Sequence, residues 1–386
     1  MRNSSRSDID PFIVMDVMEA ARAAEATGQS VIHMEVGQPG TPAPAAARTA
    51  LARALDTPLG YTVALGVPEL REGIARLYQR WYGIDLNPDR VVVTAGSSAA
   101  FLLAFTALFD AGERVGVAEP GYPSYRQILR ALSLEPVGLP THAAEGHRLQ
   151  PDAVRAADIA GAIVASPNNP TGTMLGHEGL AGLVEACQSQ GRAFISDEIY
   201  HGLHYGARAV SALEVSDEVY VINSFSKYFS MTGWRLGWMV VPQDHVRRIE
   251  RLAQNMFICA PHAAQIAAIG ALSGEAEAEL EGNRAVYAEN RRIVTEALTA
   301  MGLTHFAPPD GAFYVYVDVS HLSSDTLALS REILSTAGVA VTPGLDFDAL
   351  RGGGMLRLSY ARATRDVAEG MSRLAVFFNA RQPLRA

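Results

Sequence analysis

Short apolar segments alternate with helical segments through the middle of the chain, between residues 91 and 241. Each apolar segment has the length of a buried strand, and most are followed by residues with helical spacing. This alternation favours a mostly parallel β-sheet with helices on both faces, because parallel strands need a crossover connection. The expected strands cover 91–95, 115–118, 162–165, 193–196, 219–223 and 236–241, with helices from about 98, from about 124 and over 177–190.

The segments on either side of this alternation predict a second, smaller unit of α+β type. Because the two ends of a chain often meet, we expect the first helix to pack against the C-terminal block. The predicted division is an N-terminal arm with part of the small domain at 1–43, a large domain at 44–284 and a small domain at 285–386. Helices are expected at 12–27, 42–55, 68–82, 244–302 and 325–337, and strands at 31–36, 313–317 and 355–360.

Charge and composition exclude several classes of partner. A net charge of −9 and an isoelectric point of about 5.6 argue against binding nucleic acid by phosphate neutralisation. Two cysteines in 386 residues form no disulfide framework. The apolar run at 99–109 is too short to span a bilayer, and the N-terminus lacks the apolar region of a secretory signal. We therefore expect a cytoplasmic protein with no membrane partner.

One lysine has unusual neighbours. Lys227 lies among serines and aromatic residues, and Arg235 follows eight residues later. Desolvation and a nearby cation both lower the pKa of a lysine, and a neutral amine is a nucleophile. A surface lysine on a loop is the alternative for Lys227 taken alone. The same cation could also hold a phosphate.

Further polar side chains follow three of the expected strands, where ligands bind in open α/β sheets. Ser97 and Ser98 open a helix whose free N–H groups favour a phosphate, although an ordinary helix cap is the simpler interpretation. Asn169 lies in a turn and could donate to an oxygen anion. Asp197 would be costly to bury without a partner, and Tyr200 follows it. An amine, a carboxylate, a phenol, an amide and an anion site together fit pyridoxal phosphate.

Three motifs then stand in one order along the chain: SPNNPTG, SDEIY and SFSKYFSMTGWRLGW. With them the chain resembles the pyridoxal-phosphate-dependent aminotransferases of class I/II and fold type I, almost end to end from Ile32 to Tyr360. The resemblance implies a large domain with a mostly parallel sheet, a smaller α+β domain and a homodimer. It also implies a role in amino acid metabolism or biosynthesis, in which an L-amino acid gives its amino group to a 2-oxo acid, 2-oxoglutarate by family habit.

The resemblance assigns roles residue by residue. Lys227 would form the Schiff base and move the proton between Cα and C4′. Asp197 would keep the pyridine nitrogen protonated, and Tyr200 would bond O3′ with Asn169. Other expected cofactor contacts are Tyr122 on the ring, Ser97, Ser98, Ala99, Ser224, Ser226 and Arg235 on the phosphate, and Tyr61 on the phosphate bound by the other subunit. The expected contacts to the substrate α-carboxylate are Arg357, the Gly37 backbone and Asn169.

Some positions depart from the family pattern. Ser98 stands where many relatives carry lysine or glutamine, and Thr106 stands where some aspartate-preferring relatives place a lysine. Aspartate preference is therefore in doubt, and aromatic amino acids, aliphatic amino acids and alanine stay open. His201 and His204 have the i, i+3 spacing of metal ligands but lack a third, so a polar turn face is expected and no metal.

Two other functions stay open. A C–S lyase or decarboxylase of the same fold would use the same Schiff base and break another bond at Cα. A non-catalytic regulator is the alternative outside enzymes, and both the acidic charge and the few residues before the first helix argue against it.

Overall fold

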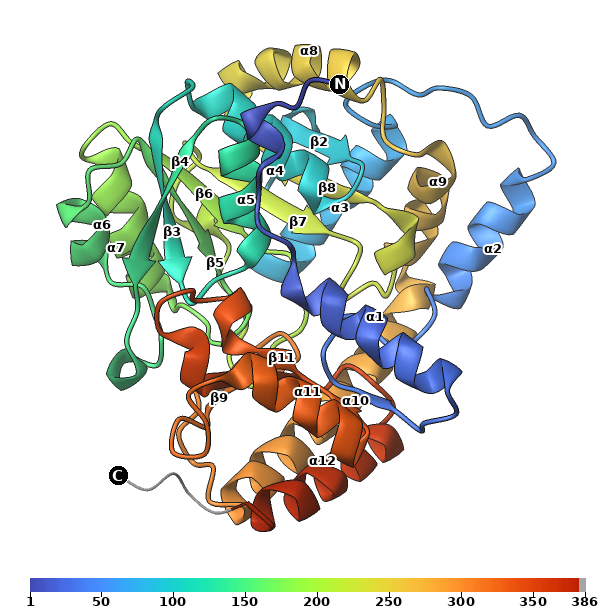
Figure 1. Cartoon of the computed structure of the whole chain (residues 1–386). Helices are drawn as coiled ribbons and strands as arrows, with labels where there is room; N and C mark the ends of the chain where they lie inside the picture. The colour runs from blue at the N-terminus through green and yellow to red at the C-terminus, as the bar shows by residue number, and fades with distance from the viewer. Residues whose placement is uncertain (382–386) are drawn as a thin grey trace.

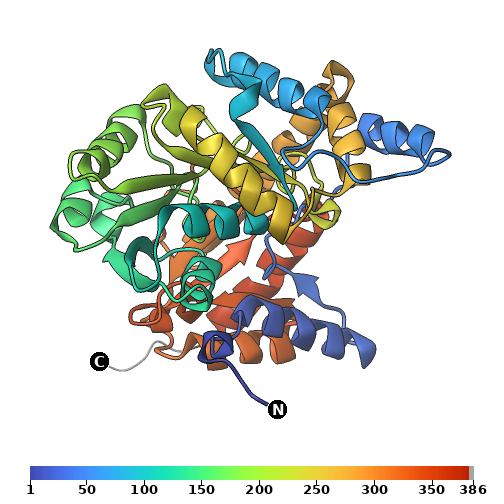
Figure 2. The same cartoon turned by 90° about the horizontal axis from the view of Figure 1, so that it is seen from above.

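The computed structural model describes residues 1–381, and a seven-stranded sheet lies at its centre (Figures 1 and 2). The strand order is β2-β8-β7-β6-β5-β3-β4. Only β8 runs antiparallel to its two neighbours, and every other pair is parallel, so the sheet is mostly parallel as predicted. The strands are β2 (Val91–Thr94), β3 (Arg114–Glu119), β4 (Glu135–Pro140), β5 (Gly161–Ala165), β6 (Ala193–Asp197), β7 (Tyr220–Ser224) and β8 (Gly237–Val240).

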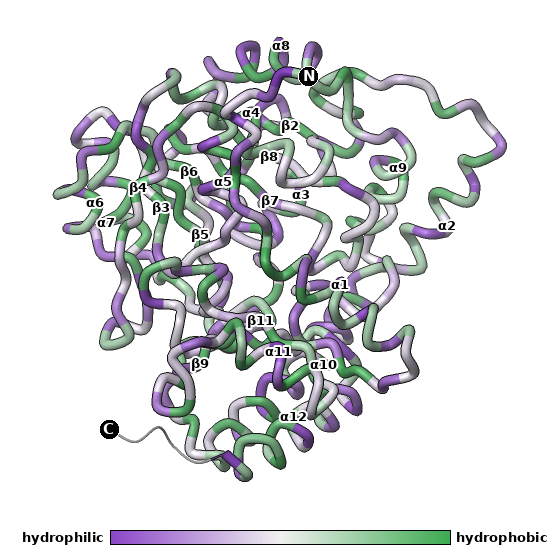
Figure 3. Tube along the Cα trace, in the orientation of Figure 1, coloured by the Kyte–Doolittle hydropathy of each residue, from purple (hydrophilic) through white to green (hydrophobic). Residues whose placement is uncertain are grey.

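Helices cover both faces of this sheet because its strands are apolar on both sides. All residues of β2, β7 and β8 are buried. One face packs on α4 (Ser97–Leu108), α5 (Pro123–Ala131) and α8 (Val246–Met256). The other packs on α3 (Pro68–Tyr82), α6 (Pro151–Ala156) and α7 (His177–Gln188). In Figure 3 the hydrophilic colours recur along outer segments such as α8.

A smaller three-stranded antiparallel sheet, in the order β11-β12-β9, forms the second unit. Its strands are β9 (Tyr314–Asp318), β11 (Thr342–Pro343) and β12 (Met355–Ser359), and its helices are α10 (Gly274–Ala300), α11 (Thr326–Ala337) and α12 (Thr364–Asn379). The expected boundary at residue 284 falls inside α10, which runs on without a break, so that division stays a prediction.

The N-terminal segment joins this smaller unit, as expected. The short strand β1 (Ile32–His33) pairs with β10 (Val339–Ala340) in parallel. Helix α1 (Ile13–Ala26) contacts α11 and the strands β10 and β11, and Figure 1 shows it beside α11. Helix α2 (Ala45–Ala54) and the loop that follows it project from the body of the molecule (Figure 1).

Several expectations needed correction. The strand expected at 31–36 shrinks to β1, and the single helical region at 244–302 is divided into α8, α9 (His262–Ala271) and α10. Strand β4 and helices α6 and α12 were not anticipated. Prolines at both ends of the EPVGLP segment hid β4, which is at the sheet edge, where proline is tolerated. No helix within residues 1–381 has the length and apolar character needed to cross a membrane.

Candidate active site

The ends of four strands of the large sheet lie together at one edge. Thr94 and Ser224, at the ends of β2 and β7, both pair with Gly237 at the start of β8. Asp197, at the end of β6, pairs with Ala165 at the end of β5. The expected polar segments are therefore brought to one edge of the sheet.

The turn between β2 and α4 forms an anion cradle. Helix α4 begins at Ser97, and the preceding Gly96 has a φ of +79° and no side chain to cap the helix. The backbone N–H groups of Ser97, Ser98 and Ala99 belong to the first turn, where no intrahelical acceptor exists. A Cβ on Gly96 would lie 2.5 Å from Nη2 of Arg235, so glycine lets the guanidinium approach the turn. The helix start and this cation together favour an anion.

Two hydroxyl groups lie close together after β7. The Oγ of Ser224 donates to the Oγ of Ser226 over 2.8 Å and lies 3.2 Å from the carbonyl oxygen of Leu236. Because Leu236 directly follows Arg235, the hydroxyl pair and the guanidinium belong to adjoining segments. Both serines are buried. They are suited to supplement the anion cradle with neutral donors.

Lys227 is the only lysine in the chain, and it follows β7 directly. Its Nζ donates to the carbonyl oxygen of Gly37 over 2.6 Å and lies 5.6 Å from the ring centre of Tyr200. Desolvation lowers the pKa of Lys227 to about 8, and the Arg357 and Arg235 cations act in the same direction. A substantial fraction of this amine is therefore neutral near physiological pH.

Asp197 is buried at the end of β6 and accepts two hydrogen bonds. The hydroxyl of Tyr125 donates to Oδ2, and the backbone N–H of Ile199 donates to Oδ1 over 3.1 Å. Burial raises the pKa of Asp197 to about 6, while both hydrogen bonds and the Lys227 cation oppose that rise. Sequence reasoning missed Tyr125. Its spacing of three residues from Tyr122, at the start of α5, was the available signal.

Tyr122 also packs against the N-terminal arm. The ring of Phe12 lies 5.8 Å from that of Tyr122, at an angle of 82°. The ring of Tyr125 lies 5.2 Å from Tyr122 on α5. The predicted ring-stacking residue is thus held between the arm and the helix that supports Asp197.

Tyr200 reaches the small sheet. Its hydroxyl lies 2.8 Å from that of Tyr314 on β9. A Cβ on Gly37 would overlap the Tyr314 hydroxyl, so this contact requires glycine. Alternation along β9 was visible in the sequence, but it did not indicate which aromatic residue faces the site.

Arg357 lies on β12, the middle strand of the small sheet, and is 2% exposed. Its Nη1 donates to Oδ1 of Asn169 over 2.8 Å, and its Nη2 donates to the carbonyl oxygen of Glu35. The guanidinium carbon lies 4.4 Å from the ring centre of Tyr314 and 4.6 Å from that of Phe347.

Within residues 1–381 no carboxylate is in ion-pair contact with this arginine, although the charge of Arg357 acts on the buried Asp346, and the Nε of Arg357 lacks a hydrogen-bond acceptor. A buried guanidinium without a counter-ion is costly unless a ligand supplies one. At 2% exposure, Arg357 is a buried residue and not a surface arginine.

A second carboxyl group lies behind Asp197. Oε1 of the buried Glu198 accepts hydrogen bonds from Ser196, Ser211 and Ala212, while Oε2 has no hydrogen-bond partner in the described chain. His201 lies 3.5 Å away, and its Nε2 donates to the carbonyl oxygen of Ser166. Burial raises the pKa of Glu198 to about 8 and lowers that of His201 to about 3, so both are mainly neutral at pH 7. The expected polar turn face at His201 is wrong.

Two other residues lie away from the site. Tyr61 is 83% exposed on the loop that follows α2. Thr106 lies near the end of α4 and faces α8, roughly 13 Å along the helix from its start. Thr106 therefore lies away from the cradle at the start of α4.

The chain is similar to known aminotransferases. The sequence profile of the family "Aminotransferase class I and II" matches residues 29–374. A valine–pyruvate aminotransferase of Mycobacterium tuberculosis is 48% identical, over 97% of each chain. A protein of known structure from Silicibacter pomeroyi is 62% identical with a TM-score of 0.94, over 99% of this chain and 100% of that one. The structure of the aspartate aminotransferase from Thermus thermophilus with maleate is 32% identical with a TM-score of 0.92, over 97% of this chain and 100% of that one.

Proposed function

The chain belongs to the class I and II aminotransferase family, whose members transfer amino groups with pyridoxal phosphate, and we propose that its donor is an apolar L-amino acid bound between Lys227 and Arg357. The observation that carries the site assignment is the buried guanidinium of Arg357, which lacks an acidic partner in the described chain. An α-carboxylate supplies the missing charge and takes two parallel hydrogen bonds.

The residues present fit pyridoxal phosphate. The Gly96 turn, which a Cβ would fill, and the Arg235 guanidinium suit a phosphate group. The Asp197 carboxylate suits a protonated ring nitrogen, and the single lysine suits the aldehyde. We assign the remaining contacts as expected: Tyr122 to the ring face, Asn169 and Tyr200 to O3′, and Ser97, Ser98, Ala99, Ser224 and Ser226 to the phosphate. When bound, the cofactor ring supplies an electron sink for the charge left at Cα after a proton leaves.

Residues of the chain itself bind the substrate, carry the proton and position these groups. Arg357 binds and orients the substrate carboxylate, and Asn169 fixes Arg357. The Nζ of Lys227, with a pKa of about 8, takes up and returns a proton near neutral pH. Tyr125 and the N–H of Ile199 stabilise the charged form of Asp197. Phe12 packs on Tyr122 and covers one edge of its ring.

The charge distribution supports an apolar donor. The cations that act on Tyr122 and Lys227 are Arg235 and Arg357. Arg126, which bonds the backbone of Asp346 and Phe347, is also occupied by Glu119. A second carboxylate, as in aspartate, would therefore find no unpaired cation beside Arg357 among the described residues. Burying that charge alone would weaken binding.

The same reasoning applies to the acceptor, since donor and acceptor use one site in turn. The name of the mycobacterial relative, valine–pyruvate aminotransferase, pairs an apolar donor with a monocarboxylate acceptor. We therefore propose pyruvate beside 2-oxoglutarate, the acceptor that the family resemblance predicts. The two acceptors differ in that 2-oxoglutarate carries a second carboxylate, which would need an unpaired cation, and pyruvate does not.

Members of this family typically form homodimers. We propose that Tyr61 reaches the phosphate bound in the other subunit. Its 83% exposure, with Leu59 and Val63 also exposed on the same loop, supports a surface that a second copy covers.

A donor and acceptor panel tests this proposal. Purified holoenzyme is assayed with valine, leucine, phenylalanine and aspartate, each against pyruvate and 2-oxoglutarate, and with alanine against 2-oxoglutarate alone. We expect the apolar donors to exceed aspartate in kcat/KM by about tenfold or more, the effect of one unpaired buried charge. A preference for aspartate would overturn the donor assignment. Release of ammonia without a matching new amino acid would favour the lyase.

A further inference from the structure

Helix α1 begins without a capping side chain of its own. Phe12 occupies the N-cap position and makes no side-chain hydrogen bond there. The carboxylate of Asp346 fills that role from 333 residues away, since Oδ1 accepts the N–H of Ile13 over 3.1 Å and Oδ2 accepts that of Val14 over 3.2 Å. Asp346 is 4% exposed. Because the first N–H groups of a helix lack partners and attract negative charge, Asp346 anchors the start of α1.

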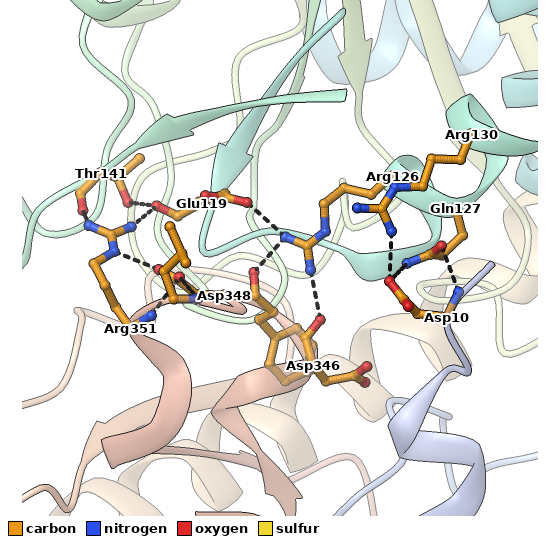
Figure 4. A network of polar contacts seen from close by, with 11 residues as sticks. Asp10, Glu119, Arg126, Gln127, Arg130, Thr141, Asp346, Asp348 and Arg351 are labelled. Atoms are coloured by element: carbon orange, nitrogen blue, oxygen red, sulfur yellow. Dashed lines mark hydrogen bonds and ion pairs between the residues drawn. The ribbon is translucent and has the colours of Figure 1, made fainter. Parts of the chain in front are cut away.

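The backbone of the same segment is tied to the large domain. Arg126, on α5, donates from Nη2 to the carbonyl oxygen of Asp346 over 3.1 Å and from Nη1 to that of Phe347 over 3.3 Å. It also bonds Glu119, at the end of β3, over 3.0 Å. The N–H of Gly121 donates to the carbonyl oxygen of Phe347 over 3.1 Å. Figure 4 shows the Arg126 guanidinium between Glu119 and Asp346.

The side chain of Phe347 extends this connection to the substrate clamp. Its ring is fully buried, and its centre lies 4.6 Å from the guanidinium carbon of Arg357. Asp346 and Phe347 thus join the start of α1, the large domain and Arg357. Phe12, which directly precedes α1, packs against Tyr122. The segment of Asp346 and Phe347 therefore contacts both the Arg357 guanidinium and the start of α1, the helix that positions Phe12.

We propose that Asp346 is a positioning residue that couples binding of a substrate carboxylate at Arg357 to the seating of α1 and Phe12 over Tyr122. This rests on the proposed function, because Arg357 must be the carboxylate clamp. A carboxylate at Arg357 fixes the guanidinium and the Phe347 ring beneath it. Because Asp346 adjoins Phe347 and caps Ile13 and Val14, a fixed Phe347 also holds the start of α1 in place.

The chain offers a graded series of variants and a matched control. Asp346→Ala removes both cap acceptors, and Asp346→Asn keeps one. Asp10→Asn changes an arm carboxylate that accepts hydrogen bonds from Gln127 and Arg130 on the outer surface (Figure 4). It leaves the Asp346 cap intact. All three keep Lys227 and Arg357.

Amide hydrogen exchange across residues 13–26 measures the coupling directly. The probe is 2-methylalanine, which carries the α-carboxylate but no hydrogen on Cα. In wild-type holoenzyme and Asp10→Asn, we expect a saturating concentration to slow exchange in α1 by roughly threefold or more. In Asp346→Ala the slowing should vanish although the probe still binds, as followed by cofactor absorbance. Asp346→Asn should be intermediate.

Steady-state kinetics give a second readout. Losing a helix cap costs about 1 kcal/mol, and only the part of this cap that strengthens when a carboxylate binds at Arg357 changes KM. We therefore expect KM for every donor to rise by up to roughly fivefold in Asp346→Ala, with kcat and the affinity for pyridoxal phosphate little changed. Full slowing of α1 exchange in Asp346→Ala, or an unchanged KM, would overturn the coupling alone. If the wild-type enzyme itself fails to transfer amino groups, the proposed function is wrong, and this inference, which depends on it, is wrong as well.

Discussion

The cofactor half and the carboxylate half of the site are built in different ways. Lys227 and Asp197 follow neighbouring strands of one sheet, β7 and β6. Arg357 instead bonds Asn169, 188 residues away, and Glu35, 322 residues away. The first half is therefore set once the large sheet has formed. The second exists only when the N-terminal segment, the large domain and the small sheet have come together.

This difference predicts two kinds of failure. A change in the cofactor half should act on the chemical step and on cofactor affinity, and it should leave substrate binding nearly intact. A change in the carboxylate half should act on KM for every donor, because all donors share the α-carboxylate.

The largest effect is expected from Lys227→Ala. Removing the amine removes both the covalent attachment and the proton carrier, so turnover should fall by at least about a thousandfold. Because Lys227 is the only lysine, borohydride treatment of wild-type holoenzyme should place one pyridoxyl group on the peptide that contains it. Mass spectrometry checks this. Turnover retained in the variant, or trapping on any other peptide, would remove Lys227 from the reaction.

Arg357→Lys should have the next largest effect. Lysine keeps the charge but not the planar fork, so both the bidentate contact and the hydrogen bond to Asn169 are lost. We expect KM to rise roughly a hundredfold for every amino acid donor, with the absorbance spectrum of the bound cofactor unchanged. A rise confined to one donor, or a change in the spectrum, would contradict the separation of the two halves.

The cofactor half could be predicted from the sequence because it follows strand ends. Each buried strand is an apolar run that stops at a polar turn, and in a parallel sheet such turns meet at one edge. Ser97, Asn169 and Asp197 were found by that rule, and Lys227 was found from its serine and aromatic neighbours. Their detailed roles came from the family resemblance and are still predictions.

The carboxylate half could not be found in the same way. Arg357 stands in an ordinary strand, and only its tertiary partners distinguish it from a surface residue. Asp346 and Phe347 act on α1, Arg126 and Arg357, which lie far away in the sequence. The sequence predicted a polar turn face at His201, but residues that the fold brings around it bury its side chain. Contacts of this range leave no local pattern.

Tyr125→Phe tests the support beneath Asp197. The change removes one hydrogen bond to a carboxylate, an interaction worth about 1.5–3 kcal/mol, and keeps the ring packing. We expect kcat to fall about tenfold or more and KM for donors to stay within about twofold. The pKa of Asp197 should rise above its value of about 6. As the solution is acidified, the variant should therefore lose affinity for the cofactor at a higher pH than the wild type does.

Tyr122→Phe is the matched control for this prediction, because it removes a hydroxyl from the same face of α5 without touching Asp197. If the two variants shifted the pH profile of cofactor binding equally, Tyr125 would have no specific role. A rise in KM alone would assign Tyr125 to the carboxylate half and break the comparison.

The smallest effect on turnover is expected from Glu198→Gln. Burial raises the pKa of Glu198 to about 8 from its ordinary 4.5, so the folded protein holds a proton that the unfolded chain releases. The stability that this proton provides is complete below about pH 4.5 and is lost as the pH rises toward 8. Glutamine keeps the neutral shape, and the melting temperature of the variant should therefore fall less steeply between about pH 5 and pH 8, by a few °C.

Glu214→Gln provides the contrast, because Arg208 pairs with Glu214 and the pKa of that carboxyl is lowered. Its removal should cost stability at about pH 8, the opposite sign to Glu198→Gln. Wild-type and Glu198→Gln melting curves that stay parallel across this range would mean that Glu198 is ionised in the folded protein. Asp197 would then share its strand end with a second negative charge, and His201, which lies 3.5 Å from Oε2 of Glu198, would be the group available to balance it.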